Sequence, residues 1–251
     1  MQLNYCTVMT VLEQIAMHNT LLKSNKTIQG EVKKNRGITL SVDCNIFGFD
    51  KGKLKVLVIK SDYEAYKNQF SLIGDLVHPD ENIDSAALRI LLEKTSLDTI
   101  YLEQVKTYGN VQRHPAGRVV TIAYCALINV NHHQLKIKDH ELQWVDYDDL
   151  KIMAFDHLQI IQDCKKWLQQ KLLIEPIAFN LLPKKFSLRA VQELYSAILG
   201  ENLDRRNFRK KILSLGYIVD INQMEKDVTH RPGKLYKFDD NTTMQSTKAV
   251  G

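Results

Sequence analysis

The sequence predicts an α+β fold in two units, a strand-rich unit followed by a smaller helix-rich one. From residue 38 to residue 173, apolar runs rich in β-branched residues alternate with two amphipathic helical stretches. From Ile174 onward, three short helical stretches precede a pair of short strands. Basic residues are concentrated in this second unit, and such a concentration indicates a polyanionic partner.

The first unit opens with a predicted hairpin. Residues 38–49 and 54–59 are its strands, and Asp50-Lys51-Gly52 is the turn signal between them. A helix is predicted over residues 84–95, with Asp84 as its N-cap. The predicted apolar face of this helix consists of Ala87, Leu88, Leu91 and Leu92.

The remaining elements of the first unit follow in order. Strands are predicted over residues 101–109, 118–129 and 141–145, and a helix over residues 158–173. The inward face predicted for this helix is Ile160, Ile161, Cys164, Trp167 and Leu168.

The second unit contains three predicted helices. Pro176 suits the first turn of one that continues to Pro183, and Ser187 caps the next. Asp204 caps the third, RRNFRKKILSL, which Gly216 ends. Strands over 217–221 and 235–238 enclose a polar segment. Three helices followed by a two-stranded wing is the order of a winged helix-turn-helix domain.

Charge and composition limit the class of partner. The segment from Lys184 to Ser214 has eight basic and three acidic residues, and so carries the whole formal net charge of +5. This favours a nucleic acid over a membrane. No leader and no run of eighteen apolar residues is evident, so we expect a cytoplasmic protein. The absence of a C-x-x-C pair argues against a zinc site, and Cys44 and Cys125 are expected to be buried thiols.

The third helix of the second unit is predicted to read DNA bases. Phe208, Ile212 and Leu215 form its apolar stripe. The candidate base-reading residues are Arg205, Arg206, Asn207, Arg209 and Lys210. Further candidate DNA contacts are Lys184, Lys185, Ser187, Arg231 and Lys234. The alternative is a solvated basic helix, and RNA is less favoured because no run of exposed aromatic residues offers a stacking platform.

Residues 72–97, LIGDLVHPDENIDSAALRILLEKTSL, resemble the Nudix signature G-x5-E-x7-R-E-U-x-E-E-x-G-U, where U is a bulky apolar residue. The matching residues are Glu81, Arg89, Leu91, Glu93 and Leu97. The departures are Asp75 and Ser96 for the glycines, and Ile90 and Lys94 for two glutamates. The resemblance implies that the predicted fold is a Nudix-like α/β/α sandwich followed by a C-terminal winged helix-turn-helix domain.

The departures decide the expected chemistry. In the family, glutamates one turn apart hold Mg²⁺, and positions 90, 93 and 94 share one side of the helix. Two of these three positions cannot ligate here, so we expect no catalytic residue, no metal and no cofactor, and a cleft that binds a ligand. The candidate ligand-binding residues are Asp75, Glu81, Arg89, Glu93, Arg113 and Arg118.

Four alternatives to this ligand site remain open. Arg89 and Glu93 can form a structural pair instead, and Arg113 and Arg118 can be solvated loop residues. The chain can also be an active hydrolase of a nucleoside diphosphate derivative such as ADP-ribose, or the first domain can be an inert dimerisation domain.

The combination of domains resembles the Nudix-related transcriptional regulators of bacteria. The segment EPIAFNLLPKKFSLRAVQELYSAILGENLDRRNFRKKIL is similar to the arabinose-responsive regulators of Bacteroidetes, as are SVDCNIFGF, RVVTIAYCALINV and LYKF. The resemblance implies a homodimer on a palindromic double-stranded DNA operator. It further implies a sugar effector, with L-arabinose first, another pentose or sugar derivative second and ADP-ribose third.

The predicted organisation has four parts. Residues 1–37 are an N-terminal extension or linker, and residues 38–173 a ligand-sensing domain. Residues 174–240 are the DNA-binding domain, and residues 241–251 a disordered tail. The predicted function is a ligand-responsive, sequence-specific regulator of sugar-utilisation genes.

Overall fold

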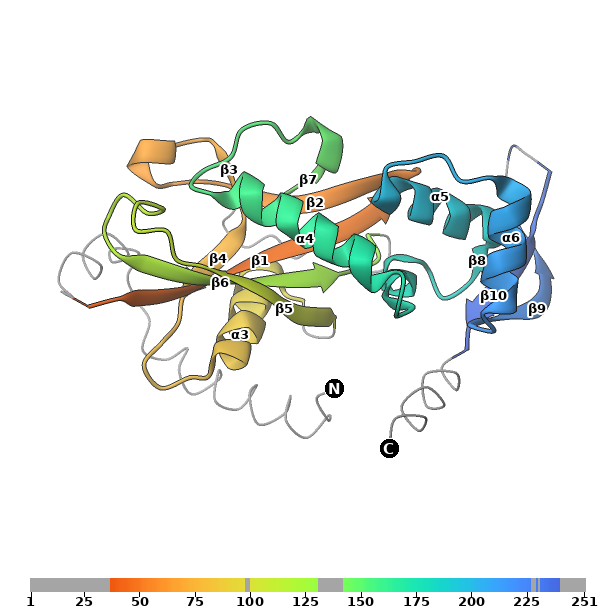
Figure 1. Cartoon of the computed structure of the whole chain (residues 1–251), viewed down its shortest axis with the longest axis horizontal. Coiled ribbons are helices and arrows are strands. Elements are labelled where there is room, and N and C mark those ends of the chain that lie inside the picture. The colour runs from red at the N-terminus through yellow and green to blue at the C-terminus, as the bar shows by residue number, and fades with distance from the viewer. Residues whose placement is uncertain (1–36, 98–99, 131–141, 227–228, 230, 240–251) are drawn as a thin grey trace.

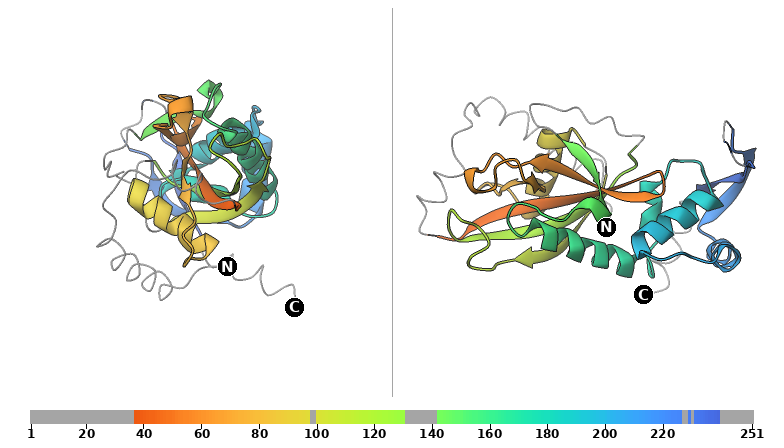
Figure 2. Two further views of the ribbon diagram at one scale, coloured as in Figure 1. Left: turned by 90° about the vertical axis from the view of Figure 1, so that its left-hand side faces the viewer. Right: turned by 90° about the horizontal axis from the view of Figure 1, so that it is seen from above.

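The computed structural model describes residues 37–97, 100–130, 142–226, 229 and 231–239. The predicted extension, apart from Gly37, and the predicted tail lie outside these residues. The first domain is a seven-stranded sheet between helices α3 (Ile83–Thr95) and α4 (His157–Lys171). The two helices cover opposite faces of the sheet (Figures 1 and 2), which confirms the predicted sandwich.

Strand β1 (Thr39–Asp50) is the centre of the sheet. One side of β1 pairs in parallel with β6 (Val119–Leu127). On its other side, the first half of β1 pairs with β4 (Ile73–Leu76) and the second half with β2 (Lys53–Lys60). The sheet therefore divides between β4 and β2 at Asn45, two residues after Asp43. The remaining strands are β3 (Phe70–Ser71), β5 (Tyr101–Tyr108) and β7 (Gln143–Asp146).

The predicted hairpin is β1 and β2, joined by a two-residue turn. Asp50 pairs with Lys53, and the residues between them, Lys51 and Gly52, have φ angles of 49° and 76°. Positive φ at both positions defines a type I′ turn, whose twist matches that of the flanking strands. The hairpin prediction is confirmed.

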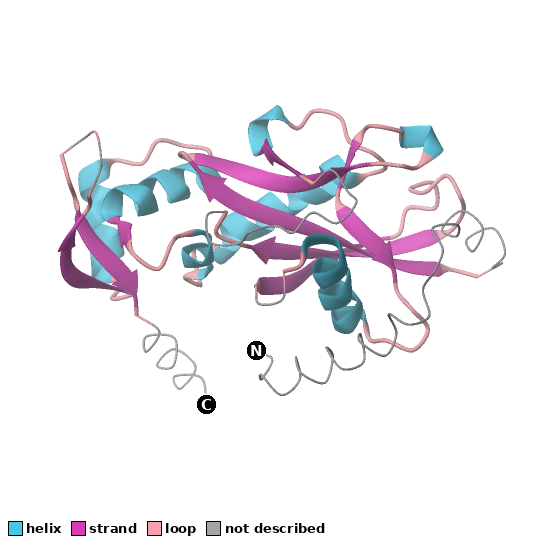
Figure 3. Cartoon of the chain, turned by 180° about the vertical axis from the view of Figure 1, so that it is seen from behind, coloured by secondary structure: helices cyan, strands magenta, loops and turns pink. Residues whose placement is uncertain are grey.

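Helix α3 begins one residue before the predicted start. Its N-cap is Asn82, so the prediction that Asp84 caps the helix is wrong. Asp84 lies in the first turn, where its carboxylate accepts a hydrogen bond from the Tyr124 hydroxyl of β6. The fully buried apolar residues of α3 are Ala86, Ala87, Ile90 and Leu91, whereas the predicted face included Leu88 and Leu92, which are only half-buried. Figure 3 views the sheet from the side that carries α3.

The second domain follows the predicted order with two differences. The stretch after Pro176 is a short 3-10 helix, η3 (Ile177–Leu181), rather than an α-helix. The helices α5 (Leu188–Leu199) and α6 (Arg205–Ser214) have the predicted caps, because Ser187 accepts from the Ala190 N–H and Asp204 from the Asn207 N–H. Strands β9 (Ile218–Met224) and β10 (Lys234–Phe238) form the wing, and β8 (Phe186–Ser187) joins them in a three-stranded sheet.

The core continues from the sheet into the second domain. Ile177, Phe179 and Leu181 of η3 belong to the same buried cluster as Ile160 and Ile161 of α4. The apolar residues on the other face of the sheet pack against α3 as a separate cluster. The shared cluster fixes the winged helix to the end of the sandwich.

Two further expectations concern cysteines and membranes. Cys44 and Cys125 are fully buried free thiols, as predicted. Among the described residues, no helix is long and apolar enough to cross a bilayer.

Candidate functional site

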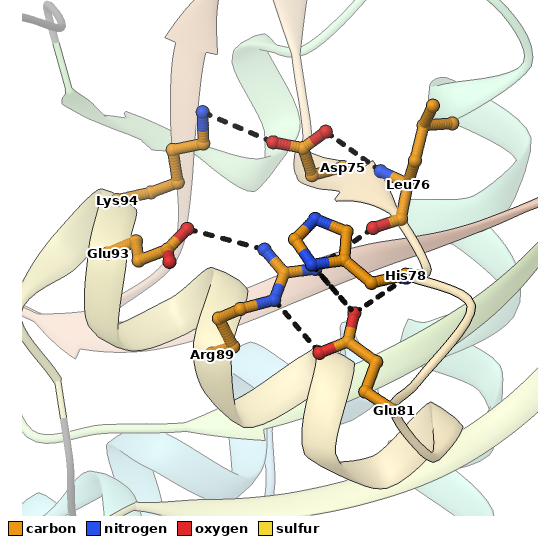
Figure 4. Close-up of polar contacts among 7 residues, drawn as sticks. All are labelled: Asp75, Leu76, His78, Glu81, Arg89, Glu93 and Lys94. Carbon is orange, nitrogen blue, oxygen red and sulfur yellow. Dashed lines mark hydrogen bonds and ion pairs between the residues drawn. The ribbon is translucent and has the colours of Figure 1, made fainter. Parts of the chain in front are cut away.

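Arg89 on α3 is held by four polar contacts (Figure 4). Its Nε and Nη2 donate to the two carboxylate oxygens of Glu81 at 2.9 and 2.7 Å. Nη2 also donates to the Leu76 carbonyl at 2.9 Å, and Nη1 to Glu93 at 3.3 Å. Because Arg89 is only 6% exposed, this network ties the loop before α3 to the helix.

Glu81 is fully engaged in this network. Its carboxylate also accepts the backbone N–H of His78 at 2.8 Å. Burial alone would raise the pKa of Glu81, but the hydrogen bonds from Arg89 and from the His78 backbone outweigh burial and lower it. Glu81 is therefore a charged anchor of the loop. The structural pair that the sequence left open, Arg89 with Glu93, is present as the contact of 3.3 Å.

Two departures from the Nudix signature contact each other. Lys94 Nζ on α3 lies 3.5 Å from Asp75 Oδ2 on β4, and Asp75 Oδ1 accepts the Leu76 N–H at 2.8 Å (Figure 4). The side chains of Lys94 and Asp75 are 27% and 24% exposed. The acid that replaces a glycine thus neutralises the cation that replaces a glutamate.

The side chains at this helix do not fit the Mg²⁺ that the Nudix signature implies. Ile90 is fully buried in the core, Lys94 is a cation and Glu93 contacts Arg89. Within the described ranges, no three His, Cys, Asp or Glu side chains gather in a way that could hold a metal ion. An ammonium group in a ligand position opposes a divalent cation, because like charges repel strongly in a partly buried site.

A cavity of about 210 Å³ opens where the sheet divides between β4 and β2. Asp75 and Lys94 lie in its wall, so the cavity reaches the Nudix helix. Its other charged, polar and aromatic lining residues include Ser41, Asp43, Lys60, Ser61, Asp62, Tyr63, Ser71, Arg113, His114, Phe155 and His157.

A buried ionic network forms the floor of this cavity. Arg113 makes two hydrogen bonds to the Asp156 carboxylate, at 3.0 and 2.7 Å, and one to Asp43 at 3.3 Å. The Arg113 side chain is 3% exposed and that of Asp43 is 9% exposed. Gly74, opposite Asp43 on β4, has no side chain because a Cβ there would lie 2.7 Å from the Val42 carbonyl and collide with the Asp43 carboxylate.

His157 completes the network in its neutral form. Its Nδ1 accepts the Leu72 N–H at 3.0 Å, so Nε2 carries the proton and lies 3.6 Å from Asp43. Burial lowers the pKa of His157, the carboxylate of Asp43 opposes that effect, and the cation of Arg113 adds to it. The floor therefore holds Arg113 as its cation and His157 as a neutral donor.

One wall of the cavity is aromatic. The rings of His114 and Phe155 stack with centroids 5.0 Å apart and an angle of 10° between their planes. Tyr63 meets His114 edge-on, with centroids 5.4 Å apart. Phe155 has a φ of 55°, a conformation that is unfavourable for a bulky residue and is often retained at functional sites. This wall offers flat surfaces for a planar ligand group.

Only part of the predicted ligand set lines the cavity. Asp75 and Arg113 do. Glu81, Arg89 and Glu93 belong to the network beside it, and Arg118 Nη1 donates to the Gly109 carbonyl at 2.6 Å. Sequence reasoning missed most of the lining residues, although Asp43 within the apolar run of β1 was a visible signal.

A larger cavity, of about 640 Å³, lies between the two domains. It is lined by Gly52, Asp148 and Lys165 of the first domain and by residues of α5, α6 and the loop between them. Every residue in its wall is exposed or half-buried. The smaller cavity has the buried charged groups that a specific ligand site requires, so it is the candidate ligand site.

The basic face of α6 is exposed as predicted. Arg205, Arg206, Arg209 and Lys210 are all exposed, whereas Ile212 is buried against the core. Asn207 is exposed in the first turn. This short helix therefore presents cations and an amide to solvent, and it lies beside the wing (Figure 1).

The other predicted DNA contacts surround this helix. Lys184, Lys185, Arg231 and Lys234 are exposed. Lys185 donates to Gln223 at 3.0 Å and Lys234 pairs with Asp220 at 2.8 Å, so both are held on the wing sheet. Ser187 is 5% exposed, and its hydroxyl caps α5 instead of facing solvent.

Comparison with known families and proteins matches both domains. The NUDIX domain family matches residues 38–164, and the NrtR DNA-binding winged helix domain family matches residues 178–238. The chain is 37% identical over 204 residues to the ADPR responsive transcriptional repressor NtrR of Acinetobacter baylyi, covering 79% of this chain and 81% of that protein. It is 29% identical over 146 residues to the ADP-ribose pyrophosphatase of Methanocaldococcus jannaschii, covering 57% and 85%.

A solved structure extends this similarity to both domains together. The crystal structure of Shewanella oneidensis NrtR complexed with a 27mer DNA matches with a TM-score of 0.72 and 28% sequence identity. The match covers 82% of this chain and 95% of that one. The chain therefore belongs to the NrtR-type family of Nudix-related transcriptional regulators, in which a Nudix domain precedes a DNA-binding winged helix domain.

Proposed function

We propose that this protein is a transcriptional repressor whose Nudix domain binds a small effector without hydrolysing it. The observation that carries the proposal is an exposed basic α6 combined with a cavity at which Lys94 occupies a metal-ligand position. A coupling free energy between the cavity and α6, typically about 1–3 kcal/mol, would make DNA affinity depend on the effector.

The effector that we propose is ADP-ribose. The relative from A. baylyi is named as ADPR responsive, and the relative from M. jannaschii as an ADP-ribose pyrophosphatase. The stacked His114 and Phe155 suit a planar base, and Lys94 suits a diphosphate. L-arabinose, the effector implied by the sequence resemblance, is the alternative. A neutral pentose offers neither a charge for Lys94 nor an aromatic plane for Phe155.

The second candidate function is Mg²⁺-dependent hydrolysis of ADP-ribose, which the similarity to a pyrophosphatase favours. Ile90 and Lys94 disfavour it, because neither can hold a divalent cation. Incubation of the protein with ADP-ribose and Mg²⁺, followed by chromatography, should show no product above the uncatalysed level. Release of AMP at rates typical of enzymes would establish the hydrolase instead.

We further propose that the protein acts as a cytoplasmic homodimer on a palindromic operator. One α6 has ten residues and can read one half-site, so a dimer is needed to bind two half-sites separated by a whole number of helical turns. Sedimentation of the protein with and without operator DNA should give two chains per duplex. A single chain per duplex would reject the dimer.

Fluorescence anisotropy tests the proposed function directly. Labelled DNA from upstream of the protein's own gene and neighbouring sugar genes is titrated at about physiological salt with excess nonspecific competitor. We expect specific binding that weakens with ADP-ribose and not with L-arabinose. DNA binding that weakens with L-arabinose alone would instead support the sugar as the effector. Specific binding indifferent to both compounds would contradict either effector assignment but keep the DNA-binding function.

A further inference from the structure

Lys94 is the side chain through which the cavity meets the Nudix helix. It lies one turn after Ile90 on α3, at a position where the Nudix signature has a glutamate. Its side chain is 27% exposed and lines the cavity of about 210 Å³. An anionic group in the cavity can therefore reach Lys94 without unfolding any element.

The arginines nearby are already committed to other partners. The Arg89 side chain is 8% exposed and makes both hydrogen bonds of its fork with Glu81. Arg113 is held by Asp156 and Asp43 in the floor. Burial lowers the pKa of His157 and of His114, so these rings are neutral donors or stacking surfaces.

The contact between Lys94 and Asp75 is longer than the ion pairs that Arg89 and Arg113 make nearby. At 3.5 Å it is longer than the about 2.7–2.9 Å of a charge-assisted hydrogen bond. Both groups are partly exposed, so the pair is screened by solvent. Lys94 can therefore exchange Asp75 for a closer anionic partner at little cost, whereas Arg89 and Arg113 cannot leave theirs.

We infer that Lys94 takes the place of a metal ion in effector recognition: it leaves Asp75 and binds the diphosphate of the effector directly. Binding of the effector then requires no divalent cation. The carboxylate of Asp75 competes with the diphosphate for Lys94, so it sets how readily the site accepts an anion. This inference rests on the proposed function only for the identity of ADP-ribose, since the position of Lys94 is independent of it.

Titration calorimetry on the full chain tests the inference with three ligands. ADP-ribose carries the diphosphate, adenosine carries the base and one ribose without it, and inorganic pyrophosphate carries the diphosphate alone. The wild type should bind ADP-ribose equally in EDTA and in millimolar Mg²⁺. Loss of one charged contact in Lys94→Met should weaken ADP-ribose binding about ten- to hundredfold and leave adenosine binding unchanged.

Two further variants separate charge from structure. Asp75→Asn removes the competing carboxylate and should tighten ADP-ribose binding, the opposite direction to Lys94→Met. Lys166→Met, on an α4 lysine whose side chain is 70% exposed, removes the same charge outside the cavity wall and should bind as the wild type does. A Lys94→Met variant that loses adenosine and ADP-ribose alike would overturn the inference in favour of a structural role.

Other outcomes also decide the matter. Wild-type binding of ADP-ribose that requires Mg²⁺ would overturn the inference while leaving the proposed effector intact. If the wild type binds no ADP-ribose, the effector proposal fails. The inference is then tested separately by titration with pyrophosphate. Equal behaviour of the wild type and Lys94→Met toward pyrophosphate would then overturn it, and weaker binding by the variant would support it.

Discussion

Arg89 and Glu81 form a two-point ion pair across the loop that leads into α3. Arg89 Nε and Nη2 lie 2.9 and 2.7 Å from the two oxygens of the Glu81 carboxylate. The Arg89 side chain is 8% exposed and that of Glu81 15% exposed. These two matching residues of the Nudix signature therefore hold the loop and the helix together. They do so independently of Ile90 and Lys94, which replace the signature's glutamates.

This pair predicts a large loss of stability when one partner is removed. Glu81→Gln leaves the buried Arg89 cation with only its longer contact to Glu93 and should lower the free energy of unfolding by about 3 kcal/mol. Urea denaturation followed by circular dichroism measures the change. Glu93→Gln is the matched control. Glu93 is 31% exposed and makes one contact of 3.3 Å with Arg89, so its loss should cost under about 1 kcal/mol. Equal losses of unfolding free energy in the two variants would contradict the assignment of Glu81 as the main partner of Arg89.

The local elements could be predicted from the sequence where one local signal decides them. Lys51-Gly52 defined the hairpin turn, and Ser187 and Asp204 marked the starts of α5 and α6 because their side chains cap their own helices. The prediction that Asp84 caps α3 was wrong, because a tertiary partner, the Tyr124 hydroxyl, binds its carboxylate. A local pattern does not reveal such a partner.

The candidate site was less predictable because its residues come from distant segments. Asp43, Arg113 and His157 lie on a strand, a loop and a helix that meet only in the folded sheet. Lys94 was visible as a departure from the signature, but its contact with Asp75 requires the register between β4 and α3. The cationic face of α6 could be predicted, because helical spacing separates Phe208 and Ile212 from the cations. The prediction that Leu215 continues the apolar stripe is wrong, since α6 ends at Ser214 and Leu215 is 42% exposed.

The neutral state of His157 predicts a loss of stability in acid. Burial lowers the pKa of His157 in the folded protein, whereas an unfolded histidine titrates near about 6.5. As the pH falls through that value the unfolded state takes up a proton that the folded state does not, so unfolding is favoured. One such histidine should cost at most about 1.4 kcal/mol between about pH 7.5 and 5.5.

Comparison of His157→Gln with the wild type measures this contribution. Glutamine has no proton to take up in this range, so the free energy of unfolding of the variant should fall less steeply on acidification. His114→Gln is the companion variant. Burial also lowers the pKa of His114, but its ring is only half-buried, so the change in slope should be smaller. A His157→Gln slope identical to that of the wild type would show that His157 does not set the pH dependence.

The exposed cations of α6 predict separable effects on DNA binding. Alanine at Arg205, Arg206, Arg209 or Lys210 should weaken binding, since each removes a charge facing the nucleic acid. A residue that reads a base should cost about 1–3 kcal/mol and relax the sequence preference at one position. A residue that contacts phosphate should instead weaken binding to all sequences and reduce the salt slope by about one.

Anisotropy titrations at several salt concentrations, on specific and scrambled duplexes, distinguish these effects. Lys67→Ala is the charge-matched control, because Lys67 is 64% exposed and follows η1 (Glu64–Tyr66), at the far end of the molecule from α6 (Figure 1). If α6 reads DNA, its variants should differ from this control in affinity or in salt slope. If all four α6 variants behave as Lys67→Ala does, the basic face is only a solvated surface. Recognition would then have to come from the wing lysines and the N-terminus of α5, whose contribution the same assay measures on Lys185→Ala and Lys234→Ala.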